Sequence, residues 1–128
     1  MRFDYQQHAL ASSNPIELVV ALYDGAIRFL RQAIVAVEAN DLGARRQSVK
    51  RALDIYLHLQ SRLRYDVDSH VAGTLSQFYS EMFRYTLLAS SANSREGFER
   101  IINRVAQVRD AWRIASNDSA ALKALARG

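Results

Sequence analysis

Apolar residues recur every three or four positions along most of this chain, in four long segments separated by short polar breaks. That spacing is typical of one face of an α-helix. It predicts helices over residues 15–39, 44–63, 69–92 and 95–115, and a short fifth helix over residues 119–126. Short connections between long helices favour antiparallel neighbours. The pattern therefore predicts one all-α domain over residues 1–128, an antiparallel four-helix bundle with an extended N-terminal arm, residues 1–13.

Three of the four predicted helices carry more apolar surface than a simple bundle needs. On the first helix the apolar positions cover an arc of roughly 200°, whereas one packing surface needs about 100°. Either crossing helices and the two terminal segments cover this surface, or a partner helix lies in a groove and completes the packing. The residues expected to form such a groove are Ile55, Leu57, Leu59, Tyr79, Phe83 and Leu87.

The arm, residues 1–13, shows no clear helical period, and its apolar residues include Tyr5 and Leu10. One interpretation is a frayed terminus. The other is an arm that lays Tyr5 and Leu10 on the apolar groove, which would reduce the exposure of that groove to water. Further along, Gly25 is expected on the outer face of the first helix, where its cost in helix stability suggests a close approach by another segment.

Composition agrees with a globular helical domain. Hydrophobic residues make up 49% of the chain and charged residues 23%, with one Pro and five Gly. The chain contains no cysteine, which excludes disulfides and thiolate metal sites. The absence of cysteine suits a reducing compartment, and the N-terminal residues have no apolar run of signal-peptide length. No stretch approaches ~18 uncharged apolar residues, so we expect no membrane insertion.

Candidate catalytic and metal-binding residues are few. Arg51 and His58 are spaced as in a helical ribonuclease motif, which leaves an RNA-acting domain as an alternative function. Asp66, Asp68 and His70 are close in sequence, but a helix N-cap at Asp68 or Ser69 explains this segment better than a metal does. The sequence predicts no catalytic residue, no cofactor-binding residue and no metal site.

A basic cluster opens the second predicted helix, formed by Arg45, Arg46, Lys50 and Arg51. Cations in the first turns of a helix oppose its dipole, at a cost of at most about 0.3–1 kcal/mol each. A solvated face explains the cluster, and an acidic partner or an RNA backbone is the alternative. Aromatic residues that could stack on bases are not interleaved with these side chains, so nucleic-acid binding is not expected.

A family resemblance comes from the same stretch that opens the first helix. Pro15, Glu17-Leu18 and the hexapeptide LYDGAI at residues 22–27 resemble the opening signature of the flagellar secretion chaperones of the FliS type. Tyr5-Gln6-Gln7 and Ala111-Trp112 are similar to further parts of that pattern. Asn14 departs from it, because the family usually has Ser directly before this Pro; Asn caps a helix equally well.

The resemblance implies a non-catalytic protein that binds the C-terminal helical region of flagellin in the cytosol. It would hold flagellin in a one-to-one complex, prevent premature polymerisation and support secretion during flagellum assembly. It also implies that the N-terminal arm overlaps the cargo site, and it leaves a contact with the flagellar export gate open.

Overall fold

The computed structural model describes residues 15–116, and this part of the chain forms four α-helices and no strand. The helices are α2 (Pro15–Glu38), α3 (Leu42–Ser61), α4 (Ser69–Ser91) and α5 (Arg95–Ser116). The four predicted helices are confirmed, each boundary within two residues of the expected one. The arm, residues 1–13, and the fifth helix, residues 119–126, lie outside the described residues.

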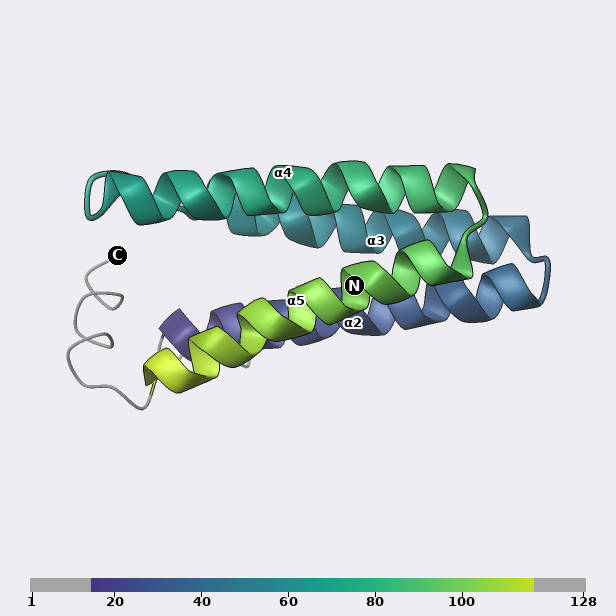
Figure 1. The fold of residues 1–128 in the computed structure, drawn as a ribbon, viewed down its shortest axis with the longest axis horizontal. Coiled ribbons are helices and arrows are strands. Elements are labelled where there is room, and N and C mark those ends of the chain that lie inside the picture. Colours follow the sequence, from purple (N-terminus) through teal and green to yellow (C-terminus); the bar gives the residue numbers. More distant parts are fainter. Residues whose placement is uncertain (1–14, 117–128) are drawn as a thin grey trace.

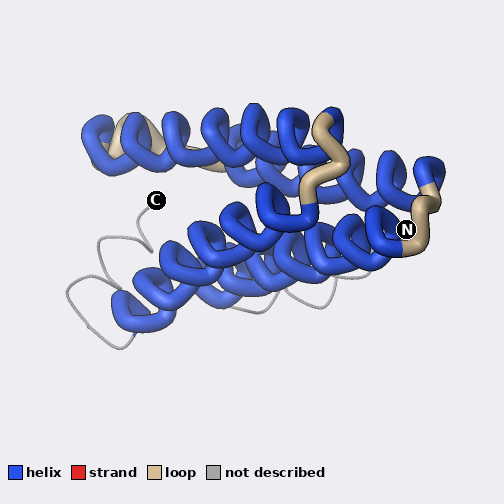
Figure 2. The backbone as a smooth tube through the Cα atoms, turned by 45° about the vertical axis from the view of Figure 1, so that its right-hand side comes forward, coloured by secondary structure: helices blue, strands red, loops and turns tan. Residues whose placement is uncertain are grey.

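The helices form an antiparallel bundle in which α2 and α4 each pack against α3 and α5. Figure 1 shows α4 beside α3 and α5 beside α2, and Figure 2 shows the same arrangement after a 45° turn. In both views α5 lies close to α4 at the short connection between them and diverges from α4 towards its own C-terminal end. The bundle is therefore closed at one end and open at the other.

Side chains in the short connections between the helices cap the helix ends. Asp41 accepts a hydrogen bond from the Ala44 backbone N–H at 3.0 Å, and Asp68 accepts one from Val71 at 3.0 Å. Ser94 caps α5 by accepting from the Gly97 N–H at 2.9 Å. Asn40 and Asn93 end the preceding helices with positive φ values of 54° and 51°, a conformation that Asn tolerates better than most residues.

The core lies along the bundle axis and draws on all four helices. Its largest fully buried side chains include Tyr23 and Leu30 from α2, Ile55 from α3, Met82 from α4 and Phe98 from α5. The apolar periodicity predicted these positions because each lies on the inward stripe of its helix. Among residues 15–116, no helix is both long and apolar enough to cross a membrane.

The expectation that Gly25 lies on the outer face of its helix is wrong. Gly25 is buried, and a Cβ placed there would lie 3.2 Å from Cδ1 of Ile55. The expected close approach exists, but it is made by α3 inside the bundle. The error arose because α2 buries two faces, so a position outside its main apolar stripe still meets a neighbour.

Candidate functional site

A groove of about 680 Å³ opens where α5 diverges from α4. We call it the end groove. Its wall is made of side chains from all four helices and from the connection between α3 and α4. The apolar residues that line it include Leu18, Val19, Leu63, Val67, Val71, Leu75 and Trp112. A concave apolar surface of this size can bind a row of apolar side chains from another polypeptide better than it can bind a small polar substrate.

The base of the end groove is held by a hydrogen-bonded aromatic cluster. The Tyr23 and Tyr79 hydroxyls lie 2.8 Å apart, and the Trp112 Nε1–H donates to the Tyr23 hydroxyl at 3.2 Å. Burial raises the pKa of Tyr23 and of Tyr79, so both hydroxyls stay neutral. Because the rings are linked in this way, α2, α4 and α5 present a fixed apolar base at the point where the bundle opens.

The rim of the end groove carries charged and titratable side chains. It is lined by His58 from α3, by Arg62, which caps the C-terminal end of α3, and by Asp68 at the start of α4. Burial lowers the pKa of His58, and the positive charge of Arg62 lowers it further. Arg64 and Asp66 form an ion pair at 2.8 Å on the connection between α3 and α4. The groove thus has an apolar interior with polar groups at its edge, the usual anatomy of a protein interface.

The residues that the sequence predicted for a groove divide into two groups. Ile55, Leu59 and Tyr79 are buried in the bundle core, although Leu59 and Tyr79 also line the end groove. Leu57 and Leu87 are exposed, and Phe83 is partly buried. Tyr5 and Leu10 lie outside the described residues. Whether any of these side chains contacts a partner remains a prediction.

The exposed group belongs to a second surface, which we call the outer α3–α4 face. The Tyr56 hydroxyl lies 3.1 Å from Thr86 Oγ1, and Gln60 Nε2 donates to Ser80 Oγ at 2.9 Å, which fixes the antiparallel register of the two helices. In this register Leu57 lies near the level of Phe83, and Leu53 near that of Leu87. The face is an apolar seam, with the Gln60 amide satisfied by α4 rather than left for a partner.

The candidate catalytic pair does not form one site. The Arg51 guanidinium lies over the Phe29 ring, 5.7 Å from its centroid, on the side of α3 that faces α2. His58 lines the end groove about two turns further along α3. Asp68 caps α4 and Asp66 pairs with Arg64, and within residues 15–116 no cluster of three His, Asp or Glu could hold a metal ion.

The basic cluster at the start of α3 is also dispersed. Arg45 donates to the Asn93 side chain at 2.9 Å, and Lys50 pairs with Asp54 at 3.2 Å on the outside of α3. Arg51 contacts Phe29, and Arg46 lies exposed on another part of the helix. Residues that are neighbours in sequence therefore point to different surroundings, and they do not form one continuous basic surface.

Sequence reasoning missed part of the end groove. Val71 and Leu75 are not among the residues that the sequence predicted for a groove, and Trp112 was identified only as part of the family resemblance. Val67 lies on a connection, where no periodicity applies. One sequence pattern could have identified these residues. Apolar residues recur at every fourth position, at Val67, Val71, Leu75 and Tyr79, and this extends the apolar stripe of α4 beyond the start of the helix.

Comparisons with known proteins agree on one family. A family model described as "Flagellar protein FliS" matches residues 2–119. A protein of Campylobacter jejuni named "Flagellar secretion chaperone FliS" is 31% identical over 114 residues, which cover 89% of each chain. A protein of the same name from Bacillus subtilis is 27% identical over 111 residues, 87% of this chain and 82% of the relative. Another from Salmonella typhimurium is 27% identical over 108 residues, 84% of this chain and 80% of the relative.

Proposed function

The chain belongs to the flagellar protein FliS family of flagellar secretion chaperones, and from that premise we propose that it is a cytosolic export chaperone for flagellin. It binds the C-terminal helical region of flagellin in a one-to-one complex. By occupying apolar surface that flagellin would otherwise bury in the filament, it prevents premature polymerisation and keeps the cargo fit for secretion. The task needs no catalytic group, only a complementary surface.

The end groove is the observation that carries this proposal. An amphipathic helix buries its apolar face in a groove through side chains at positions i, i+3 or i+4, and i+7. The end groove offers an apolar interior of about 680 Å³ bounded by four helices, with charged side chains at its rim. A helix seated there would bury apolar side chains inside and leave its polar face towards His58, Arg62 and Asp68.

The outer α3–α4 face is the second contact in this proposal. Leu57, Phe83 and Leu87 form an apolar seam on the outside of the bundle. A cargo with several helical segments that wraps around the bundle can reach both surfaces. We assign the anchoring contacts to the end groove, because a concave site excludes water from more of the cargo surface than a seam does.

The N-terminal arm, residues 1–13, is the proposed occupant of the cargo site in the free protein. Pro15 lines the end groove, so the arm joins the bundle at the rim of that groove. Docking of Tyr5 and Leu10 would cover apolar surface at roughly 25 cal/mol per Å². A longer amphipathic helix buries more area and displaces the arm.

Binding of the flagellin C-terminal helical region to matched variants tests the proposal. Val71→Asp places a charge in the end groove, and Val35→Asp makes the same change at an exposed position on α2 outside it. We expect Val71→Asp to weaken binding at least about tenfold, or about 1.4 kcal/mol. We expect Val35→Asp to bind like the parent chain. Isothermal titration calorimetry gives both affinities.

A second pair tests the outer α3–α4 face. Leu87 and Leu88 are adjacent on α4 and both exposed, but they point to different sides of the helix. Leu87→Asp should weaken binding by less than Val71→Asp does, and Leu88→Asp should not change it. If Val71→Asp binds as tightly as Val35→Asp, the end groove is not the cargo site. If the parent chain does not bind flagellin, the proposed function is wrong.

A further inference from the structure

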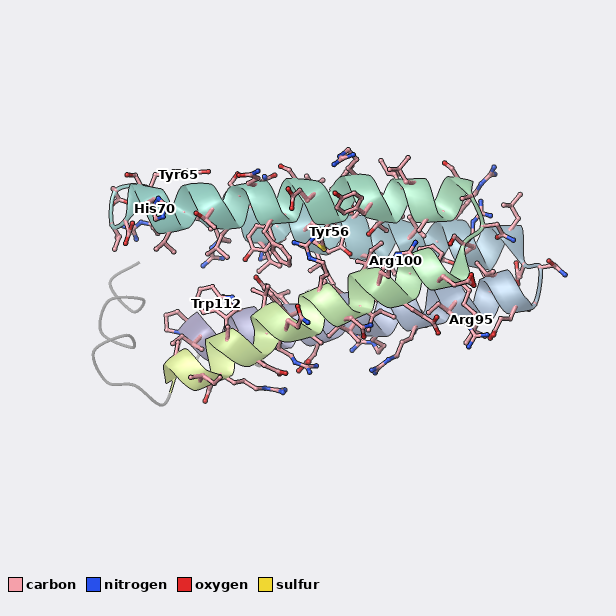
Figure 3. All side chains as sticks on the ribbon, viewed as in Figure 1. Tyr56, Tyr65, His70, Arg95, Arg100 and Trp112 are labelled. Carbon is pink, nitrogen blue, oxygen red and sulfur yellow. The ribbon has the colours of Figure 1, made fainter. Side chains whose placement is uncertain are left out.

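A second cavity of about 320 Å³ lies between α4 and α5, next to the end groove. We call it the side groove. Val71 and Thr74 line it from α4, and Val108, Ala111 and Ala115 line it from α5, together with Leu75 and Trp112, which also line the end groove. Figure 3 shows His70 on α4 and Trp112 on α5 near the open end of the bundle. Six of its eight lining residues are apolar, so it leaves apolar surface open to water that another segment can cover.

The chain itself continues from the wall of this cavity. Ala115 lines the side groove and α5 ends at Ser116, so the next residues start beside it. Asn117, Asp118 and Ser119 are turn and N-cap formers, and residues 120–127 contain neither Gly nor Pro. Leu122 and Leu125 lie three positions apart, among alanines that allow close packing. This segment has the composition of a short amphipathic helix.

The dimensions of the segment and the cavity agree. A helix over residues 119–126 would be about 12 Å long, and the wall of α5 from Val108 to Ala115 rises about 10 Å. A helix that follows α5 after a tight turn runs back antiparallel to it, which is the direction of the side groove. A helix of eight residues is not stable alone in water, so it needs an apolar surface to pack on.

We propose that residues 119–126 pack as a helix in the side groove, with Leu122 and Leu125 as the buried anchors. The segment fills the gap that the divergence of α5 leaves against α4 and covers one side of Trp112. The proposal does not depend on flagellin binding, because every contact that it names is within the chain.

Engineered disulfides test the placement directly, since the chain has no cysteine of its own. Thr74 is exposed at the side groove, so Thr74→Cys combined with Leu122→Cys, or with Leu125→Cys, should form an intramolecular disulfide under mild oxidation. The matched control pairs Leu87→Cys with the same partner. Leu87 is exposed on the same helix about 20 Å further along.

We expect at least one Thr74 pair to cross-link about tenfold faster than its Leu87 control, because packing raises the effective concentration of the two thiols. Equal rates for the Thr74 and Leu87 pairs would overturn the proposal. A Thr74 pair that cross-links mainly between two molecules would assign the side groove to a second copy of the chain instead, and would also overturn it.

Fluorescence of Trp112, the single tryptophan, is an independent measurement. The double variant Leu122→Asp, Leu125→Asp should shift its emission to the red and raise its quenching by acrylamide, while far-UV circular dichroism confirms that the bundle is folded. Lys123→Glu, between the two anchors, should leave the emission unchanged. If the double variant leaves the Trp112 emission unchanged but deletion of residues 1–12 changes it, the N-terminal arm covers Trp112. This result would refute the proposal.

Discussion

Gly25, Gly73 and Gly97 differ in how much space the bundle leaves for the methyl group that alanine would add. A Cβ on Gly97 would lie 2.9 Å from the Ala89 Cβ and 3.1 Å from Ser94 Oγ. At Gly25 the nearest atom is the tip of the Ile55 side chain at 3.2 Å, and at Gly73 nothing lies within 4 Å. Gly97 therefore allows α4 and α5 to approach closely at the closed end of the bundle, whereas Gly73 is an exposed position in α4 with no such constraint.

Gly97→Ala should lower the free energy of unfolding by about 1–3 kcal/mol, because the short helix connection cannot relax around an added methyl group. Gly73→Ala should raise it by about 0.5–1 kcal/mol, since alanine favours an exposed helix interior. Urea denaturation of the two variants measures both values. Similar effects of the two substitutions would mean that helix propensity, not the contact with Ala89, governs Gly97.

At the scale of the elements, α5 is held to α2 by charge as well as by apolar packing. Asp24 on α2 accepts from Arg109 Nη1 at 2.9 Å and from Arg113 Nη2 at 3.5 Å. Arg109 is partly buried, and its guanidinium also pairs with Asp110 at 3.2 Å. These contacts lie in the half of α5 that diverges from α4, so they replace part of the packing that α4 does not supply there.

Asp24→Asn should lower the free energy of unfolding by about 1 kcal/mol, at the upper end for partly exposed ion pairs. Asp54→Asn removes the more exposed Lys50 pair on α3 and is expected to have a smaller effect. Hydrogen exchange should locate the first effect in α5, as faster exchange of amides in residues 105–116. Uniform acceleration across all four helices in Asp24→Asn would contradict the local role assigned to this contact.

At the scale of the whole molecule, both terminal segments join the bundle at its open end. Pro15 lines the end groove and Ala115 lines the side groove, so the chain enters and leaves the described fold beside the two apolar cavities. An exposed apolar surface of this kind promotes aggregation of a free protein, but a chaperone needs such a surface to bind its cargo. In our proposals residues 1–13 cover the end groove until the cargo displaces them, and residues 119–126 cover the side groove permanently.

Deletion of residues 1–12 should increase the binding of an apolar dye and leave the affinity for flagellin unchanged or higher, because the arm competes with the cargo for the same groove. Far-UV circular dichroism should show the same helix content in the bundle. Calorimetry with the flagellin C-terminal region decides the outcome. Loss of flagellin binding in a folded truncated protein would show that the arm contributes contacts to the complex, and the covering role would have to be abandoned.

Helix positions, helix ends and core residues could be read from the sequence. A period of 3.6 residues identifies the inward side of a helix, so Tyr23, Leu30 and Phe98 were predictable as core positions. Asp68 and Ser94 were predictable as caps, because a side-chain oxygen at a helix start has a backbone donor within reach wherever the helix lies. All of these are local properties of consecutive residues.

The tertiary structure alone decided which apolar residues form a surface. Ile55, Leu57, Leu59 and Tyr79 have similar apolar character, yet Leu57 is half exposed and the other three are buried. The deciding quantity is the direction in which α5 leaves α4, which opens the end groove around Val71 and Trp112. Periodicity gives an angle around one helix axis and says nothing about where neighbouring axes converge or separate, because that depends on contacts such as those of Gly97 and Asp24 between residues far apart in the chain.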